Sequence, residues 1–141
     1  MFLPDVNVWV ALAFTAHVHH GSARAWFASV PDDRRCHFCR LTQMGFLRIA
    51  NNPAAVPYSA VTQDQAWKLY DHFLSHPRVD FADEPAGLEP RWRQLARLPQ
   101  FSPKVWNDAY LAAFAQVGGF EVVTFDQGFT QYKATGCTIL S

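Results

Sequence analysis

Apolar residues recur along the chain at two spacings, one typical of amphipathic helices and one typical of short buried strands. The helical spacing is clearest in one segment, where four apolar residues stand three or four positions apart: Ala66, Leu69, Tyr70 and Phe73. Just before them, Thr62 and Gln65 match a capping box, in which each side chain binds the backbone of the other. A helix is therefore predicted to begin after Thr62 and to end before Pro77.

Five more helices are predicted from the same spacing and from boundary residues. Three of them lie in the first part of the chain, at residues 8–14, 18–30 and 41–51. The fourth has Pro90 in its first turn, a position that proline tolerates, and its inward-facing residues are Trp92, Leu95 and Ala96. Ser102-Pro103 caps the fifth and Gly118-Gly119 closes it. Its apolar stripe is expected at Trp106, Tyr110, Ala113 and Val117.

Short apolar runs between these helices predict four or five strands, at residues 2–4, 35–38, 79–82, 121–125 and 137–140. Pro4 cannot donate to a sheet ladder, so it is placed at the end of the first strand. Strands that alternate with helices favour a parallel sheet covered on both faces. The expected fold class is therefore α/β, a three-layer α/β/α arrangement around a central four- or five-stranded parallel sheet.

Composition agrees with one folded domain spanning residues 1–141. Half of the residues are apolar and 17% are charged, which excludes a disordered chain. We see no apolar run long enough for a membrane span and no secretory signal, and the three cysteines are interpreted as reduced thiols of a cytoplasmic protein. The formal charge is zero, from 12 basic and 12 acidic residues, so nucleic-acid binding would require the charges to be segregated on the surface.

Two aspartates follow predicted strands directly. Asp5 comes after residues 2–4, and Asp126 comes after residues 121–125. In a parallel sheet both lie at the carboxyl edge, where open α/β folds build their sites, and neighbouring strands would bring the two carboxylates within reach of one ion. The alternative is that each aspartate only caps the helix that follows it.

Asp108 lies inside a predicted helix, and its neighbours at helical spacing are apolar: Leu111, Ala112 and Ala115. A carboxylate among apolar groups is costly unless it is paired or binds a metal. Lys104, four residues earlier, offers a simple ion pair as the alternative.

Three converging aspartates would suit Mg²⁺ or Mn²⁺, which prefer hard oxygen ligands and retain bound waters. Such an ion can activate a water and screen the charge of a phosphodiester, so no protein nucleophile is needed. Asn7 and Thr124 each stand two positions from an aspartate and could orient a carboxylate or a metal-bound water, or could serve as local caps.

Four segments together resemble the PIN-domain family, and within it the VapC-type toxins of toxin–antitoxin pairs. They are Leu3-Pro4-Asp5-Val6-Asn7-Val8, Leu41-Thr42-Gln43-Met44-Gly45-Phe46-Leu47-Arg48, Trp106-Asn107-Asp108-Ala109-Tyr110-Leu111-Ala112-Ala113 and Val123-Thr124-Phe125-Asp126. The resemblance runs from residue 1 to about residue 140, and it implies a PIN-like fold. It also implies a metal-dependent endoribonuclease, acting on transfer or ribosomal RNA, that forms a homodimer and is silenced by a VapB-like antitoxin whose tail enters the acidic pocket.

The resemblance also assigns the site. The first, third and fourth acidic positions of the family correspond to Asp5, Asp108 and Asp126. The second, usually a glutamate, corresponds to Gln43, whose helical neighbours are apolar and which is therefore expected to face inward. Glutamine supplies a carbonyl oxygen but no charge, so metal affinity is expected to be lower than in relatives with glutamate. Arg40, at the junction of a strand and a helix, is the first choice for contacting an RNA phosphate.

Three alternatives accompany this prediction. Because Gln43 replaces an acid, the domain could bind RNA or a protein without cleaving it. A phosphatase of the haloacid-dehalogenase type also begins with an aspartate after a strand, but Asn7 stands where its second, proton-donating aspartate belongs. Cys36 and Cys39 form a C-x-x-C pair, yet a structural zinc site needs a second pair, so buried thiols are expected.

Overall fold

The computed structural model describes residues 1–141 and contains one sheet of five parallel strands. The strands are β1 (Phe2–Pro4), β2 (Cys36–Phe38), β3 (Val79–Phe81), β4 (Glu121–Thr124) and β5 (Cys137–Ile139). Their order in the sheet is β3-β2-β1-β4-β5. The predicted strands are confirmed, and Pro4 is the last residue of β1. Because β1 and β4 are neighbours, with Leu3 opposite Val122 and Pro4 opposite Val123, the residues that follow them meet at one edge.

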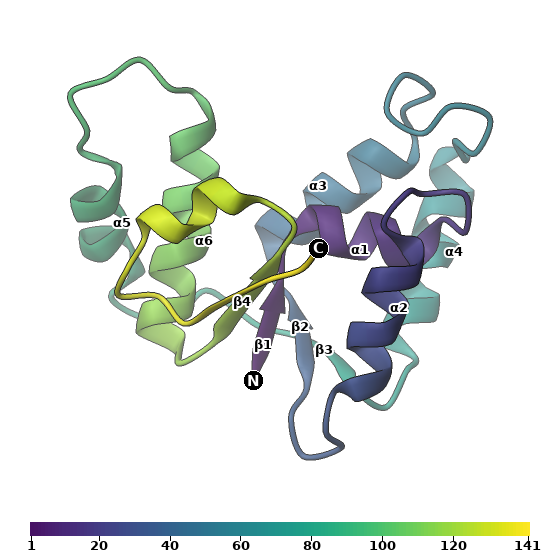
Figure 1. Cartoon of the computed structure of the whole chain (residues 1–141), viewed down its shortest axis with the longest axis horizontal. Coiled ribbons are helices and arrows are strands. Elements are labelled where there is room, and N and C mark those ends of the chain that lie inside the picture. The colour runs from purple at the N-terminus through teal and green to yellow at the C-terminus, as the bar shows by residue number, and fades with distance from the viewer.

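The helices lie on both faces of the sheet, so the three-layer prediction is confirmed (Figure 1). One face is covered by α1 (Val6–Ala13), α2 (His20–Ser29), α3 (Arg40–Ala50) and α4 (Gln63–Leu74). The other is covered by α5 (Leu88–Ala96) and α6 (Lys104–Gly118), with the short 3₁₀ helix η1 (Gln127–Gln131) after β4. No helix is long and apolar enough to cross a membrane.

The central strands β1, β2 and β4 are largely apolar and buried because helices cover both faces of the sheet there. Alternate residues enter two separate cores: Phe2 and Val123 pack with α1 to α4, whereas Leu3 and Val122 pack with α5 and α6. This alternation explains why the buried central strands show no clear polar face that periodicity could reveal.

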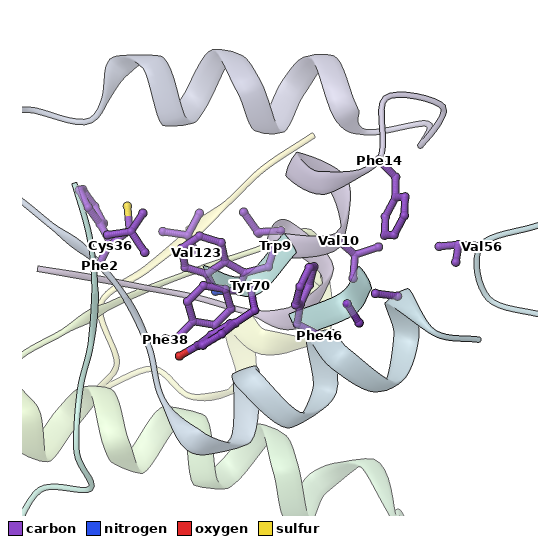
Figure 2. Packing of buried hydrophobic residues seen from close by; sticks show 14 of the residues in the cluster. Phe2, Trp9, Val10, Phe14, Cys36, Phe38, Phe46, Val56, Tyr70 and Val123 are labelled. Carbon is purple, nitrogen blue, oxygen red and sulfur yellow. The ribbon is translucent and has the colours of Figure 1, made fainter. Parts of the chain in front are cut away.

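Aromatic rings dominate the core beneath α1, and Figure 2 shows them side by side. Trp9 is fully buried and stacks on Phe38, with ring centroids 3.8 Å apart. Phe38 in turn meets Tyr70 edge to face at 4.9 Å. Offset or edge-to-face pairs of this kind add to the burial energy. Since Trp9 lies one turn after Asp5, this packing holds the start of α1 firmly against the sheet.

The predicted inward stripe of α6 is wrong at its two ends. Trp106 is 60% exposed and Val117 is 37% exposed, whereas Ala109 and Ala113 are buried. α6 packs against the sheet and α5 together, so small alanines line its contact face and let the elements approach closely. Its buried residues are Val105, Ala109, Leu111, Ala112, Ala113, Phe114 and Ala115.

Helix boundaries differ at two further places. The second helix begins at His20 rather than Val18, and Val18 is 86% exposed because residues 15–19 form turns. Ser102 does not cap α6 through its side chain; Pro103 is the N-cap residue, and the Ser102 carbonyl accepts from the Val105 amide. The capping box at Thr62 is confirmed by both of its hydrogen bonds, and Gly119 closes α6 with φ 76°.

The helices α1 and α3 approach closely at Gly45, so a larger residue there is expected to destabilise the fold. A Cβ atom at Gly45 would lie 2.5 Å from Cγ2 of Val6, a β-branched side chain with little room to rotate. We expect Gly45→Ala to lower the free energy of unfolding by about 1 kcal/mol, because overpacking outweighs the better helix propensity of alanine. Urea unfolding followed by circular dichroism measures this. The control is Gly21→Ala in α2, where a Cβ meets nothing within 4 Å; a loss of stability there as well would contradict the explanation.

Candidate active site

Asp5 lies between β1 and α1 and uses both carboxylate oxygens. Its Oδ1 accepts from the Val6 amide at 2.7 Å, so the capping role considered as an alternative is real. Its Oδ2 accepts from the Thr124 hydroxyl at 2.9 Å, across the sheet from β4. The Asp5 amide donates to the carbonyl of Val123 at 2.8 Å, which fixes the backbone at the sheet edge. The Asp5 carboxylate therefore caps α1 through one oxygen and binds Thr124 of β4 through the other.

Asn7 and Thr124 tie the ends of β1 and β4 together. The Asn7 amide nitrogen donates to Thr124 Oγ1 at 3.0 Å, and the Asn7 carbonyl oxygen accepts from the Phe125 amide at 3.2 Å. Thr124 Oγ1 also accepts from the Asp126 amide at 3.1 Å. One buried hydroxyl thus contacts the Asp5 carboxylate and the Asp126 backbone, so the two aspartates are held on adjacent strand ends.

Asp126 and Asp108 share a lysine. Asp126 Oδ1 accepts from the Gly128 amide at 2.9 Å and caps η1, while its Oδ2 accepts a hydrogen bond from the Lys104 ammonium. The same nitrogen lies 3.7 Å from Asp108 Oδ2. The ion pair within α6 that was left open as an alternative is therefore present, but its ammonium also joins Asp108 to the end of β4.

The three carboxylates influence one another electrostatically. Burial raises the pKa of Asp5, and the charge of Asp126 raises it further. Burial raises the pKa of Asp108 to about 6, with Lys104 opposing the shift and the charges of Asp5 and Asp126 adding to it. The hydrogen bond from Lys104 lowers the pKa of Asp126. Aspartates from three distant parts of the chain thus form one acidic cluster, in which two members resist ionisation.

The oxygen atoms of the aspartates and their contacts with Lys104 indicate whether a divalent metal could bind here. No group of three histidine, cysteine, aspartate or glutamate side chains has an arrangement that could hold an ion together. Mg²⁺ does not require one, because it is usually held by one or two carboxylates and several waters. The Lys104 ammonium already lies against Asp108 and Asp126, so a cation is accommodated there by hard oxygen donors. Asp108 and Asp126 therefore offer the two carboxylates that a largely hydrated divalent cation would need.

Gln43 faces inward as predicted and is only 6% exposed. Its carbonyl oxygen accepts from the Arg40 guanidinium at 2.5 Å, and none of its hydrogen bonds reaches an aspartate. Arg40 is exposed at the first turn of α3, directly after β2, and its guanidinium lies 5.0 Å from the centre of the Phe81 ring. The roles of Gln43 beside the aspartates and of Arg40 toward RNA stay predictions.

Sequence reasoning missed one residue near this cluster. The Tyr132 side chain follows η1, its residue is 5% exposed, and its hydroxyl has no hydrogen-bond partner. Burial raises the pKa of Tyr132 to about 12, with the charges of Asp108 and Asp126 adding to the effect. No motif pointed to it, because the segment after Asp126 has neither a clear helical nor a clear strand spacing. An unpaired phenol close to two carboxylates is a further polar group of this site.

The two cysteines of the C-x-x-C pair are core residues. Cys36 and Cys39 are free and buried, as expected for these thiols, and they belong to the cores on opposite faces of the sheet. Burial raises the pKa of both thiols, which keeps them protonated and unreactive.

Comparison with known proteins identifies the fold and the family. The family model described as "PIN domain" matches residues 2–134. Ribonuclease VapC41 of Mycobacterium tuberculosis (strain ATCC 25618 / H37Rv) is 47% identical over 145 residues, which cover 100% of this chain and 99% of that protein. Ribonuclease VapC38 of the same strain is 31% identical over 134 residues, covering 91% of this chain and 86% of that protein.

Solved structures agree at the level of the fold. VapBC2 from Rickettsia felis, crystallised on a DNA fragment from its promoter, superposes with a TM-score of 0.73 at 14% identity, covering 99% of this chain and 98% of that one. The Mycobacterium tuberculosis toxin VapC20, which cleaves the sarcin–ricin loop, gives a TM-score of 0.67 at 20% identity, with 93% and 94% coverage. Together with the family match and the full-length identity, these findings lead to one conclusion: this chain belongs to the PIN-domain family, in its VapC group.

Proposed function

We propose that this protein is the toxin of a toxin–antitoxin pair, a Mg²⁺- or Mn²⁺-dependent endoribonuclease that hydrolyses RNA phosphodiester bonds. The observation that carries the proposal is the meeting of Asp5, Asp108 and Asp126 at the carboxyl edge of β1 and β4, where a cationic group already contacts two of them. The names of the curated relatives, all ribonucleases of the VapC group, support the same activity. Transfer RNA and ribosomal RNA are the proposed substrates.

In the proposed reaction, the residues of the site would hold the metal, orient a carboxylate or contact the RNA. Asp5, Asp108 and Asp126 would hold the metal, in part through bound waters because the three do not converge directly on one ion, and the bound metal would supply an activated water and charge screening at the phosphate. Thr124 and Asn7 keep the Asp5 carboxylate oriented through their hydrogen bonds. Arg40, exposed beyond the end of β2, would contact a phosphate of the bound RNA.

The partner proposed for this toxin is a VapB-like antitoxin. One of the similar folds, VapBC2 of Rickettsia felis, comes from a complex of this kind. Carboxylates that already contact the Lys104 ammonium would also accept a cationic side chain from an antitoxin tail. A homodimer, as the resemblance implies, and a cytoplasmic location, as the cysteines interpreted as reduced thiols indicate, complete the proposal.

One observation favours a second candidate, a PIN domain that binds RNA or protein without cleaving it. Gln43 brings no charge to the position of the usual glutamate, and its carbonyl oxygen is taken by Arg40. The acidic cluster therefore has three carboxylates rather than four.

Incubation of purified protein with structured RNA and Mn²⁺ separates the two candidates. The nuclease proposal expects cleavage that stops with EDTA and falls about 10³-fold in Asp5→Asn, because a metal site contributes several kcal/mol to the transition state. Asp71→Asn, an exposed carboxylate on α4, is the matched control and should cleave normally. Absence of cleavage by metal-loaded wild-type protein on every RNA tried would favour the binding module.

A further inference from the structure

Lys104 occupies an unusual position for a lysine at a helix start. It is the first residue of α6, and its ammonium contacts one carboxylate within this helix and a second one outside it. It lies 3.7 Å from Asp108 Oδ2, one turn along the helix, and it donates to Asp126 Oδ2, which is 22 residues away at the end of β4. The two carboxylates that it joins are 16% and 24% exposed, so they are much less accessible to solvent than the lysine at 63%.

A second lysine–aspartate pair in the chain shows how the contacts of Lys104 differ from an ordinary ion pair on one helix. Lys68 and Asp64 on α4 have the same i, i+4 spacing, but both side chains are at least 75% exposed and no other acid joins them. Exposed pairs of that kind contribute little, because water and salt screen them. Lys104 instead neutralises two partly buried carboxylates that would repel each other, which is the task of a counter-ion.

We propose that Lys104 is a built-in counter-ion of the acidic cluster, which competes with the divalent metal for Asp108 and Asp126 and leaves when the metal binds. This inference rests on the proposed metal site. The ammonium and a divalent cation are both positive and need the same oxygens, so their simultaneous binding is disfavoured. Metal affinity is therefore reduced by the free energy of the lysine contacts, and the carboxylates stay paired while no metal is bound.

The fold allows the exchange that this requires. The Lys104 side chain is largely exposed and sits in the first turn of α6, so it can rotate into solvent without disturbing the core.

Calorimetric titration with Mn²⁺ tests the inference without measuring activity. Lys104→Gln removes the charge and should lower the dissociation constant about tenfold. Lys104→Arg keeps the charge and should stay within about twofold of wild type. Lys68→Gln removes a lysine from the matched exposed pair on α4 and should leave the dissociation constant unchanged. Circular dichroism of each variant checks that the fold is retained.

Two results would overturn the inference, and they differ in what they say about the site. If wild type binds Mn²⁺, Asp126→Asn loses that binding and Lys104→Gln has the same dissociation constant as wild type, the metal site stands and Lys104 is a plain surface ion pair. If neither wild type nor Lys104→Gln binds Mn²⁺, the proposed metal site fails and the role of Lys104 fails with it.

Discussion

Replacement of Asp108 by asparagine is expected to abolish RNA cleavage, by about 10³-fold or more, while the protein stays folded and becomes more stable at neutral pH. The side chain is 16% exposed and belongs to the face of α6 that contacts the core, so the isosteric amide preserves packing. What it removes is a negative charge that the proposed metal needs. A loss of activity with a gain of stability is the pattern of a charge kept for function.

The direction of the stability change follows from the pKa. Burial raises the pKa of Asp108 to about 6, above its usual value of 3.8, so the native state holds the proton more tightly than the unfolded chain does. The stability associated with the protonated carboxyl is present below about pH 4 and is lost as the pH rises through about 6. Asp108→Asn is uncharged at every pH, so we expect it to gain on the order of 1–2 kcal/mol over wild type at pH 7 and nothing at pH 3.5.

Urea unfolding at the two pH values, followed by circular dichroism, measures this difference directly. Asp64→Asn is the matched control. Asp64 also pairs with a lysine four positions away, Lys68, but both side chains lie on the exposed surface of α4. This variant should show no gain at pH 7 and normal cleavage. An Asp108→Asn protein that is unfolded, or one that cleaves RNA as fast as wild type, would refute the assignment of Asp108.

The layer order, and the placement of Asp5 and Asp126 at one edge of the sheet, could be predicted because both depend on local signals. The sequence shows an aspartate directly after an apolar strand at Asp5 and at Asp126. Because strands alternate with helices in a parallel sheet, both residues lie at the same edge. The α6 stripe was mispredicted for a physical reason. Spacing alone cannot tell which face of an apolar helix is covered when the sheet and α5 contact it from different sides, and exposed Trp106 carries more apolar area than the buried alanines.

Contacts between distant residues explain what the sequence could not reveal about the site. The pair of Lys104 with Asp108 follows from spacing, but its bond to Asp126 requires the start of α6 to lie beside the end of β4. Tyr132, at the end of η1, is influenced by the charges of Asp108 and Asp126, which no local pattern around it indicates. Gln43 was correctly expected to be buried, yet its partner Arg40 depends on side-chain rotamers that no pattern of apolar positions specifies.

Replacement of Thr124 by valine is expected to lower both stability and cleavage. The Thr124 hydroxyl is fully buried, donates to Asp5 Oδ2 at 2.9 Å and accepts from the amides of Asn7 and Asp126. Valine fills the same volume without the oxygen, so a buried carboxylate and two amide donors lose a partner. Hydrogen bonds to charged groups contribute about 1.5–3 kcal/mol, and we expect a loss of about 2–3 kcal/mol in the free energy of unfolding.

Cleavage should fall about 10- to 100-fold in the same variant, because the Asp5 carboxylate is no longer held in one orientation. Thr124→Ser, which keeps the hydroxyl, should recover most of the activity, whereas a purely steric role would leave serine as impaired as valine. Thr130→Val is the surface control: its hydroxyl donates only to the Gln127 carbonyl, so both stability and cleavage should be unaffected. Since Thr124 joins the ends of β1 and β4, an active and stable valine variant would mean that the strand ends position the two aspartates without this hydroxyl.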